Sequence, residues 1–414
     1  MWTIVVGSEV CILAFGNRLF KALGITNRSE LRLFAQKSGI SVKKLEYYNE
    51  EGILPSRTDL PRILNVSGLS ELELKLKLGI IDNFILNAIG EHSGEIVKLI
   101  EEDINVKSED YAYKRVFETS LGTLYQGDCL SLMDDMEKES IDLIFADPPF
   151  NLNKVYESIM NDKLTKQEYL EWTEKWVLKC IDLLKEGGSI FIWNLPKWNT
   201  YIANILNQYL SFRHWIAVDI KYRLPIKNRL YPSHYALLYY TKGDRPNTFN
   251  EQRLPLEICR HCGGDIHDYG GYKDKLNPNG INLTDVWYDI PPVRHSKYKT
   301  RDSNELSIKL LERVISLASN EGDIVFDPFG GSGTTYIVAE ILNRRWIGIE
   351  IGPTDTIIDR FNDIGFHRSL IAEIQRNKNK LFTEEMVEIR KQNGHWLPET
   401  LPKRKNKQIS LELN

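Results

Sequence analysis

Hydrophobic residues recur at helical spacing through the first hundred positions of this chain. The pattern predicts three helices in particular, over residues 29–36, 42–50 and 80–102, of which Ser29 and Ser41 cap the first two. Charged residues from 101 to 114 then indicate a linker. We therefore expect residues 1–105 to form an all-α domain that ends in a linker helix.

Further along, short apolar runs bounded by turn residues alternate with helical patterns. The runs that predict strands are Leu121–Gln126, Ile141–Ala146, Ser189–Trp193, Trp215–Tyr222, Tyr235–Thr241, Asp323–Asp327 and Trp346–Glu350. Gly187 and Gly188 are expected to end the helix over residues 169–184. Strands that alternate with helices predict the α/β class, here a doubly wound and mostly parallel sheet over residues 111–241 and 302–370.

Composition agrees with a globular protein of two or three domains. The chain has 414 residues, 42% of them hydrophobic and 27% charged. Its apolar stretches are shorter than a membrane span needs. The apolar start, residues 1–15, contains Glu9 and lacks a basic leader, so we do not expect a signal peptide. Five scattered cysteines favour a reducing compartment, hence a cytoplasmic protein.

Basic residues are concentrated in one part of a chain whose net charge is −4. Residues 221–301 carry 14 Lys and Arg against 8 Asp and Glu, while the rest of the chain carries 39 against 49. Inside this region, residues 242–301 lose the sheet pattern and mix Gly, Pro and Asn with aromatic side chains. The region ends in the basic residues Arg294, Lys297, Lys299 and Arg301, which suit phosphate contacts. A surface that faces a polyanion is therefore expected here.

Two prolines end the predicted strand Ile141–Ala146. Pro148 and Pro149 cannot donate to a strand ladder, so Asp147 and Phe150 flank a stiff turn at the strand's carboxyl end. Ligands bind at such ends in open α/β sheets. A carboxylate, the Pro148 carbonyl and an aromatic face suit a planar group that carries an NH2. Taken alone, the turn is equally compatible with a purely structural role.

A glycine-rich turn follows the strand that ends in Asp327. Its glycines, Gly331 and Gly333 among them, let a ligand approach bare backbone, and Thr334 or Thr335 is expected to cap the next helix. The following strand ends in Glu350, 17 residues after Gly333, a distance at which an acidic residue commonly binds ribose hydroxyls. A nicotinamide-binding fold would show the same features.

These two segments together resemble DNA amino-methyltransferases. Residues 147–150 resemble the family's Asp-Pro-Pro-aromatic motif, and residues 329–333 match its Phe-x-Gly-x-Gly signature for S-adenosylmethionine. The catalytic motif precedes the cofactor motif by about 180 residues, which is the reversed order of the family's β class. The resemblance covers residues 122–351 and implies a Rossmann-like methyltransferase fold, with residues 242–301 as the target-recognition insertion. Residues 371–414 would form a C-terminal extension with a basic tail.

The resemblance implies roles for individual residues. Asp147 and the Pro148 carbonyl would bond both hydrogens of the target amine, with Phe150 stacked on the base. The residues expected to bind S-adenosylmethionine are Asp128, Asn304, Asp327, Phe329, Gly331, Gly333 and Glu350. Many members carry Lys-Pro where this chain has Glu305-Leu306, so the assignment of Asn304 rests on position alone.

The resemblance also implies a target and a biological setting. The expected substrate is a base flipped out of double-stranded DNA, adenine N6 rather than cytosine N4 because the motif begins with Asp. A restriction-modification system with a cognate endonuclease, in a prokaryotic or phage nucleoid, is the expected context. A regulator with a degenerate methyltransferase domain and an RNA methyltransferase are alternatives. The intact motifs argue against the regulator.

The N-terminal pattern between residues 20 and 79 is similar to the five-helix Cro/repressor family. That resemblance implies a helix-turn-helix whose exposed Lys43 and Lys44 contact DNA. A helical bundle that does not bind DNA is the alternative, favoured by the nearby Glu46 and Glu50. The helix over residues 80–102 is expected to pack on a neighbour or a second subunit, which would make a homodimer.

A short cysteine motif raises the question of a metal. Cys259 and Cys262 resemble half of a zinc site, but no cysteine follows them in the sequence. His261, His267 or His295 would have to complete four ligands. We therefore assign no metal ligands and retain zinc as an alternative.

Overall fold

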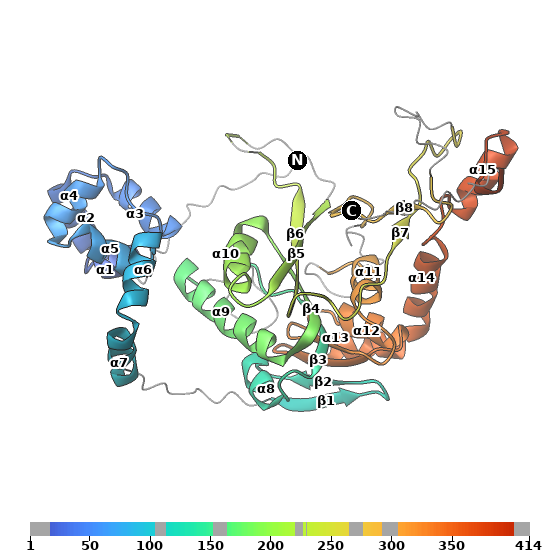
Figure 1. Ribbon diagram of the computed structural model, residues 1–414, viewed down its shortest axis with the longest axis horizontal. Helices are drawn as coiled ribbons and strands as arrows, with labels where there is room; N and C mark the ends of the chain where they lie inside the picture. The colour runs from blue at the N-terminus through green and yellow to red at the C-terminus, as the bar shows by residue number, and fades with distance from the viewer. Residues whose placement is uncertain are drawn as a thin grey trace, which may run out of the picture. The chain divides into compact units, whose positions relative to one another are not determined.

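The computed structural model describes residues 17–103, 113–151, 164–219, 227–228, 230–264, 276–291 and 305–400. It divides into two compact units (Figure 1). The first, called the helical unit, comprises Met1–Asp110, Asn151–Val155 and Asn161–Glu174. The second, called the sheet unit, comprises Tyr111–Phe150, Tyr156–Met160 and Lys175–Asn414.

Short helices build the helical unit. They are α1 (Arg18–Ala22), α2 (Arg28–Ser38), α3 (Val42–Glu51), α4 (Leu60–Ser67), α5 (Glu71–Leu78), α6 (Asn83–Glu91) and α7 (Ser93–Asp103). The Ser41 hydroxyl accepts a hydrogen bond from the Lys44 N–H, which confirms the predicted cap of α3. The prediction for α2 was wrong by two residues, since the side chain of Asn27 caps it and accepts from the N–H groups of Ser29 and Glu30.

The long helix predicted over residues 80–102 is two helices. α6 ends at Glu91 and α7 begins at Ser93, because Gly90, Ser93 and Gly94 are weak helix formers on both sides of the break. Phe84 of α6 is 75% exposed, and none of the α7 side chains described, residues 93–100, is buried.

A nine-stranded sheet organises the sheet unit, in the order β1-β2-β11-β10-β3-β4-β6-β5-β9. Its strands are β1 (Lys114–Glu118), β2 (Gly122–Gln126), β3 (Ile141–Ala146), β4 (Leu184–Asn194), β5 (Ser211–Asp219), β6 (His234–Thr241), β9 (Val286–Trp287), β10 (Ile324–Asp327) and β11 (Arg345–Glu350). The five neighbours from β2 to β4 run parallel, whereas β1 and β6 pair antiparallel with their neighbours. The predicted doubly wound, mostly parallel sheet is confirmed. β7 (Arg253–Leu254) and β8 (Ile281–Asn282) form a separate antiparallel pair.

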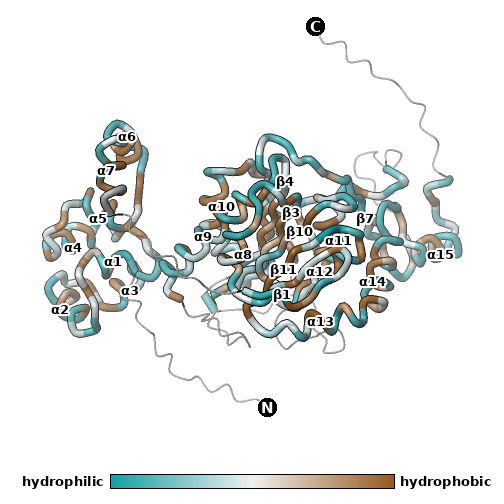
Figure 2. Tube along the Cα trace, turned by 90° about the horizontal axis from the view of Figure 1, so that it is seen from below, coloured by the Kyte–Doolittle hydropathy of each residue, from teal (hydrophilic) through white to brown (hydrophobic). Residues whose placement is uncertain are grey.

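Helices cover both faces of this sheet (Figures 1 and 2). On one face lie α8 (Cys129–Asp135), α9 (Lys166–Leu183) and α10 (Pro196–Leu206), and on the other α11 (Ile308–Ala318), α12 (Thr334–Ile341) and α14 (Ile364–Arg376). α13 (Asp355–Asn362), α15 (Glu384–Gln392) and the short helix η3 (Pro398–Thr400) complete the unit. Because both faces are covered, the central strands are mostly apolar, as Figure 2 shows. No helix within the described ranges is long and apolar enough to span a membrane.

The sequence predicted that the glycine pair at residues 187–188 ends a helix, and this prediction was wrong. α9 ends at Leu183 and β4 begins directly at Leu184, so the pair lies inside the strand. The Gly187 N–H donates to the Lys242 carbonyl, and the Gly187 carbonyl accepts from the Asn247 N–H. Residues after β6 therefore satisfy the backbone of the pair, and glycine is needed because Gly187 has φ +74° with the Asn247 side chain against it.

Candidate active site

The motifs found in the sequence meet at one edge of the sheet. β2, β11, β10, β3 and β4 are parallel neighbours, so their carboxyl ends lie side by side. Residues 127–128 follow β2, Glu350 ends β11, Asp327 ends β10 and Asp147 follows β3. The pairing of Phe326 with Ile144 aligns the last two strands. Segments about 180 residues apart in the sequence thus become adjacent, at the edge where open α/β sheets bind ligands.

The Pro-Pro turn presents a carboxylate from an anchored backbone. Asp147 and Pro149 are partly exposed, while Pro148 and Phe150 are buried. The Phe150 carbonyl accepts a hydrogen bond of 2.7 Å from the Trp198 indole N–H, which ties the turn to α10.

An aromatic group surrounds the end of this turn. The Phe150 ring is 7% exposed, and its centroid lies 5.8 Å from that of Tyr235. The Tyr235 ring is in turn 4.8 Å from Trp193 at the end of β4. Most of the Phe150 ring is therefore packed inside the protein, and the partly exposed Tyr235 adds a second aromatic face.

Asp327 holds the start of the glycine turn. Its side chain accepts from the Phe329 N–H at 2.9 Å and from the Thr335 hydroxyl at 2.5 Å. Its carbonyl accepts from the Tyr336 hydroxyl at 2.9 Å. The predicted threonine cap of α12 is wrong, because Gly333, with φ +75°, occupies the N-cap position and Thr335 bonds Asp327 instead.

Glu350 joins the glycine turn to β11. One carboxylate oxygen accepts from the Gly331 N–H at 2.6 Å, and the other accepts from the Gly352 N–H at 2.8 Å. Each oxygen keeps further lone-pair capacity for a ligand hydroxyl. Ribose binding by Glu350 stays a prediction. The two hydrogen bonds show that Glu350 also holds the glycine turn against β11.

The carboxylates of Asp147 and Glu350 both lie within electrostatic range of Asp327 at this edge. Burial raises the pKa of the Asp327 carboxyl well above its usual range, and the negative charges of Asp147 and Glu350 raise it further, against the hydrogen bonds from Thr335 and Phe329. A cationic ligand would relieve this repulsion. S-adenosylmethionine carries a positive sulfonium and therefore fits such a site. The bare backbone of the glycine turn also suits this cofactor, because it lets a ligand approach closely.

Two residues that were predicted to bind the cofactor, Asp128 and Phe329, contact other residues of the protein. The Asp128 carboxylate caps α8 by accepting from the Ser131 N–H at 3.2 Å. The Phe329 ring packs edge-on against Trp176, with centroids 5.2 Å apart. Asp128 and Phe329 nevertheless lie at the carboxyl ends of β2 and β10, so their cofactor roles stay predictions.

Several predicted residues lie outside the described part of the chain. These are Asn304, Arg294, Lys297, Lys299, Arg301, His267 and His295. Cys259 and Cys262 are described and exposed. No group of three or more His, Cys, Asp or Glu side chains suited to a metal occurs among the described residues, and zinc analysis of the purified protein tests the alternative.

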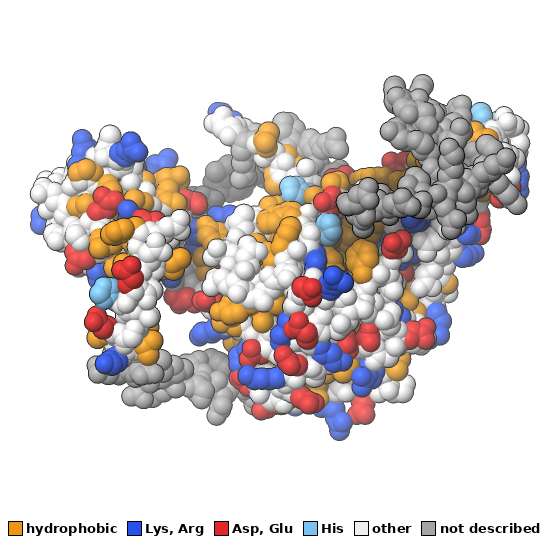
Figure 3. All heavy atoms as spheres, viewed as in Figure 1, with side chains coloured by type: hydrophobic (Ala, Val, Ile, Leu, Met, Phe, Trp, Pro, Cys, Tyr) orange, Lys and Arg blue, Asp and Glu red, His pale blue; other side chains and the backbone are white. Residues whose placement is uncertain are grey.

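The two lysines predicted to contact DNA differ. Lys43 and Lys44 are both exposed on α3. The Lys44 ammonium lies 2.5 Å from a carboxylate oxygen of Asp59, whose side chain is buried, and this hydrogen bond raises the pKa of Lys44. On the face seen in Figure 3, basic side chains of the helical unit alternate with acidic and hydrophobic ones. Lys44 is thus partly committed to an internal ion pair.

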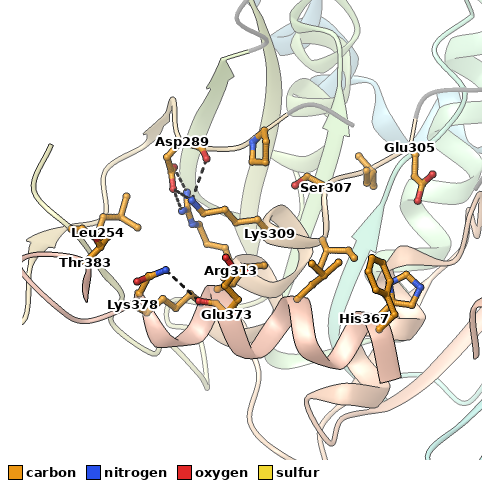
Figure 4. Close-up of a pocket in the computed structure, with 18 of the residues that line it drawn as sticks. Leu254, Asp289, Glu305, Ser307, Lys309, Arg313, His367, Glu373, Lys378 and Thr383 are labelled. Carbon is orange, nitrogen blue, oxygen red and sulfur yellow. Dashed lines mark hydrogen bonds and ion pairs between the residues drawn. The ribbon is translucent and has the colours of Figure 1, made fainter. Parts of the chain in front are cut away.

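A cavity of about 590 Å³ lies between α11 and α14 (Figure 4). At one end Asp289 accepts from both Arg313 and Lys309. Glu305 and His367 lie at the other end. The residues of the Pro-Pro turn and the glycine turn do not line it. It is therefore distinct from the strand-end site, although Arg360, which contacts the glycine turn, is among its lining residues.

The sequence did not reveal the residues that support the two turns. Trp198, Tyr235 and Arg360 reach the site from elements far along the chain and belong to no recognisable motif. Tyr336 had a weak signal, since it directly follows the glycine turn. A packing partner of this kind is identified only when the strands are assembled.

Comparison with known proteins adds an independent result. The family profile of DNA methylases matches residues 141–356. The chain is 48% identical over 379 residues to Type II methyltransferase M.BamHI of Bacillus amyloliquefaciens, covering 91% of this chain and 89% of that protein. It is 30% identical over 264 residues to DNA adenine methyltransferase YhdJ of Escherichia coli K12, covering 62% and 88%. The structure of PvuII DNA methyltransferase (cytosine-N4-specific) matches with 21% identity and a TM-score of 0.47, over 64% of this chain and 95% of that one.

Proposed function

Because this chain belongs to the DNA methylase family of amino-methyltransferases, we propose that it methylates an exocyclic amine of a base in double-stranded DNA, with S-adenosylmethionine as methyl donor. The observation that carries the proposal is the adjacency of the Asp147 turn after β3 and the glycine turn after β10. The Type II name of the M.BamHI relative supports a role as the modification enzyme of a restriction-modification system, beside a cognate endonuclease.

Asp147 and Pro148 would prepare the target amine. The lone pair of an exocyclic amine is delocalised into the base, which makes the nitrogen a poor nucleophile. Asp147 and the Pro148 carbonyl would accept its two N–H bonds and favour a pyramidal nitrogen whose lone pair points at the glycine turn. Positioning and electrostatics then provide most of the rate enhancement.

The glycine turn and the carboxylates beside it would hold the cofactor. S-adenosylmethionine supplies, when bound, a methyl group on a cationic sulfonium. Phe329, Gly331 and Gly333 would border its methionine part, and Glu350 would accept from ribose hydroxyls. The negative charges of Asp147 and Glu350 beside Asp327 favour a cation at this edge.

The aromatic group at the end of the turn would receive the flipped base. Extrusion from the duplex costs a few kcal/mol, which stacking and the two hydrogen bonds to the amine would offset. Phe150 is mostly buried, so we assign the stacking surface jointly to its exposed edge and to Tyr235.

Adenine N6 is our preferred target. Asp at position 147 favours adenine by analogy with the family, in which Ser is commoner among cytosine enzymes. The name of the YhdJ relative, a DNA adenine methyltransferase, is a second support. Cytosine N4 is the alternative, because the same turn can hold either amine.

Analysis of the product tests this proposal directly. DNA from cells expressing the chain is digested to nucleosides for mass spectrometry, and sequenced with modified-base detection to find the site. We expect N6-methyladenine at one short sequence. N4-methylcytosine would contradict the adenine assignment, while methylation confined to RNA, or none at all, would contradict the proposed function.

A further inference from the structure

We propose that Arg360, paired with Glu305, is a positioning residue that fixes the shape of the cofactor-binding glycine turn. This inference rests on the proposed function and concerns residues outside both motifs. Arg360 lies in α13, and Glu305 lies in the segment just before Ser307, the N-cap residue of α11. The side chains are 3% and 4% exposed, so both charges are buried.

The Arg360 guanidinium bonds the glycine turn directly. Its Nη1 lies 2.7 Å from the Ser332 carbonyl oxygen, 3.2 Å from the Ser332 hydroxyl and 2.9 Å from the Thr334 hydroxyl. One cationic nitrogen thus gathers three oxygens from two residues on either side of Gly333. Charge-assisted bonds of this kind are stronger than neutral ones.

The turn needs such a restraint because its glycines are intrinsically free. Gly331 and Gly333 adopt φ +55° and +75°, and glycine loses more conformational freedom on ordering than any other residue. Glu350 holds the Gly331 N–H from the β11 side. Arg360 holds Ser332 and Thr334 from the α13 side, so two opposite charges brace the turn from two elements.

Glu305 compensates the charge of this buried arginine. Its Oε1 lies 3.3 Å from Arg360 Nη1. This pairing matters because a buried charge without a partner is strongly destabilising.

His367 is a further neighbour of the Arg360 guanidinium. Its Nε2 accepts from Arg360 Nε at 3.5 Å, which requires the neutral imidazole. Burial lowers the pKa of His367, and the positive charge of Arg360 lowers it further. A neutral histidine adds no second cation beside Arg360.

The test separates positioning from a purely structural role. We compare Arg360→Gln with Arg344→Lys, a control at another buried arginine, which donates to the carbonyls of Leu342 and Ser319 next to the amino end of β11. Calorimetry gives the Kd for S-adenosylmethionine and for S-adenosylhomocysteine, and thermal unfolding of the cofactor-free protein gives Tm. We expect Arg360→Gln to raise both Kd values about tenfold, and Arg344→Lys to lower Tm without changing either.

A second variant covers the case in which Arg360→Gln folds poorly. Glu305→Gln with Arg360→Gln removes both buried charges, so we expect Tm to recover toward that of the wild type while the Kd values stay raised. In steady-state kinetics the KM for S-adenosylmethionine should rise more than kcat falls. Wild-type Kd values in a well-folded double variant would overturn the inference. Failure of the unmodified chain to bind the cofactor would instead contradict the proposed function.

Discussion

Asp147 and Asp327 are carboxylates in neighbouring turns whose surroundings prepare them for different tasks. Asp327 is 2% exposed and bonds Thr335 and the Phe329 N–H, so its side chain is part of the scaffold. Asp147 is partly exposed and follows a buried strand. Burial places the Asp327 carboxylate inside the scaffold, whereas the Asp147 side chain is partly exposed at the strand end.

The variant Asp147→Ala should lose methyl transfer and keep cofactor binding. We expect a rate loss of at least about 10³-fold, because the acceptor for the amine hydrogen disappears. The Kd for S-adenosylmethionine should stay within about threefold, since Asp147 is assigned to the target amine and not to a hydrogen bond with the cofactor. Methylated-nucleoside analysis and calorimetry measure the two quantities. Undiminished methylation in this variant would refute the role of Asp147.

His367 should make the protein less stable in acid. Its pKa is lowered in the folded state by burial and by Arg360, so the unfolded chain binds a proton more readily. The contribution of His367 to the free energy of unfolding is therefore fully present above the unfolded pKa of about 6.5. This contribution is lost as the pH falls from the unfolded pKa toward the lower folded pKa. His367→Gln removes this contribution. The difference in Tm between variant and wild type should shift in favour of the variant between about pH 7 and pH 5, and a constant difference would contradict the assignment.

At the scale of elements, the site depends on how the glycine turn enters α12. Gly333 is the N-cap residue of α12, and a Cβ at this position would lie 2.6 Å from the Ile357 Cγ2 of α13. The positive φ and this close approach both require glycine. α13 thus constrains the turn twice, through Ile357 and through Arg360.

Gly333→Ala should destabilise the protein more than Gly322→Ala does. Both glycines have positive φ, +75° and +83°, and each alanine carries a backbone penalty of about 1–2 kcal/mol. No heavy atom lies within 4 Å of a Cβ at Gly322, so this control isolates the backbone penalty from the clash with Ile357. Denaturant unfolding measures both losses, and equal losses would show that the contact with Ile357 is unimportant.

For the whole molecule, the helical unit and the sheet unit share one helix. The residues of α9 up to Glu174 belong to the helical unit, where the Lys166 ammonium donates to the Glu51 carbonyl at 2.6 Å. The residues from Lys175 onward belong to the sheet unit, with Trp176 and Cys180 fully buried. The hydrogen bonds that hold Phe150, Asp327 and Glu350 come from partners within the sheet unit.

Deletion of residues 1–103 should therefore spare methylation. The shortened chain keeps both turns and their supporting residues, although the first part of α9 loses its partners. If α2 and α3 form a DNA-binding helix-turn-helix, binding to the chain's own promoter should disappear. A methylation assay and gel-shift titration of promoter DNA separate the two functions. Lost methylation in a folded, cofactor-binding deletion would show that the helical unit takes part in catalysis.

Much of the fold was predictable because its signals are local. The apolar run of β3 and its two prolines, the glycines after β10 and the Ser41 cap of α3 act through neighbours in the sequence. The predictions that were wrong concern residues whose partners lie far away in the sequence. The glycine pair inside β4 is held by Lys242 and Asn247, and Thr335 bonds Asp327 rather than capping α12, so distant partners overrode the local preference.

The sequence by itself determined which chemical groups this protein carries and at which strand ends they occur. Residue types and breakers are properties of short segments, and the order of the two motifs is simply the order of the chain. Only the tertiary structure decided that β10 lies beside β3, which brings Asp147 next to the glycine turn. It also decided that Arg360 and Glu305 brace that turn, because strand order and buried charge pairs arise from contacts between segments that no local pattern connects.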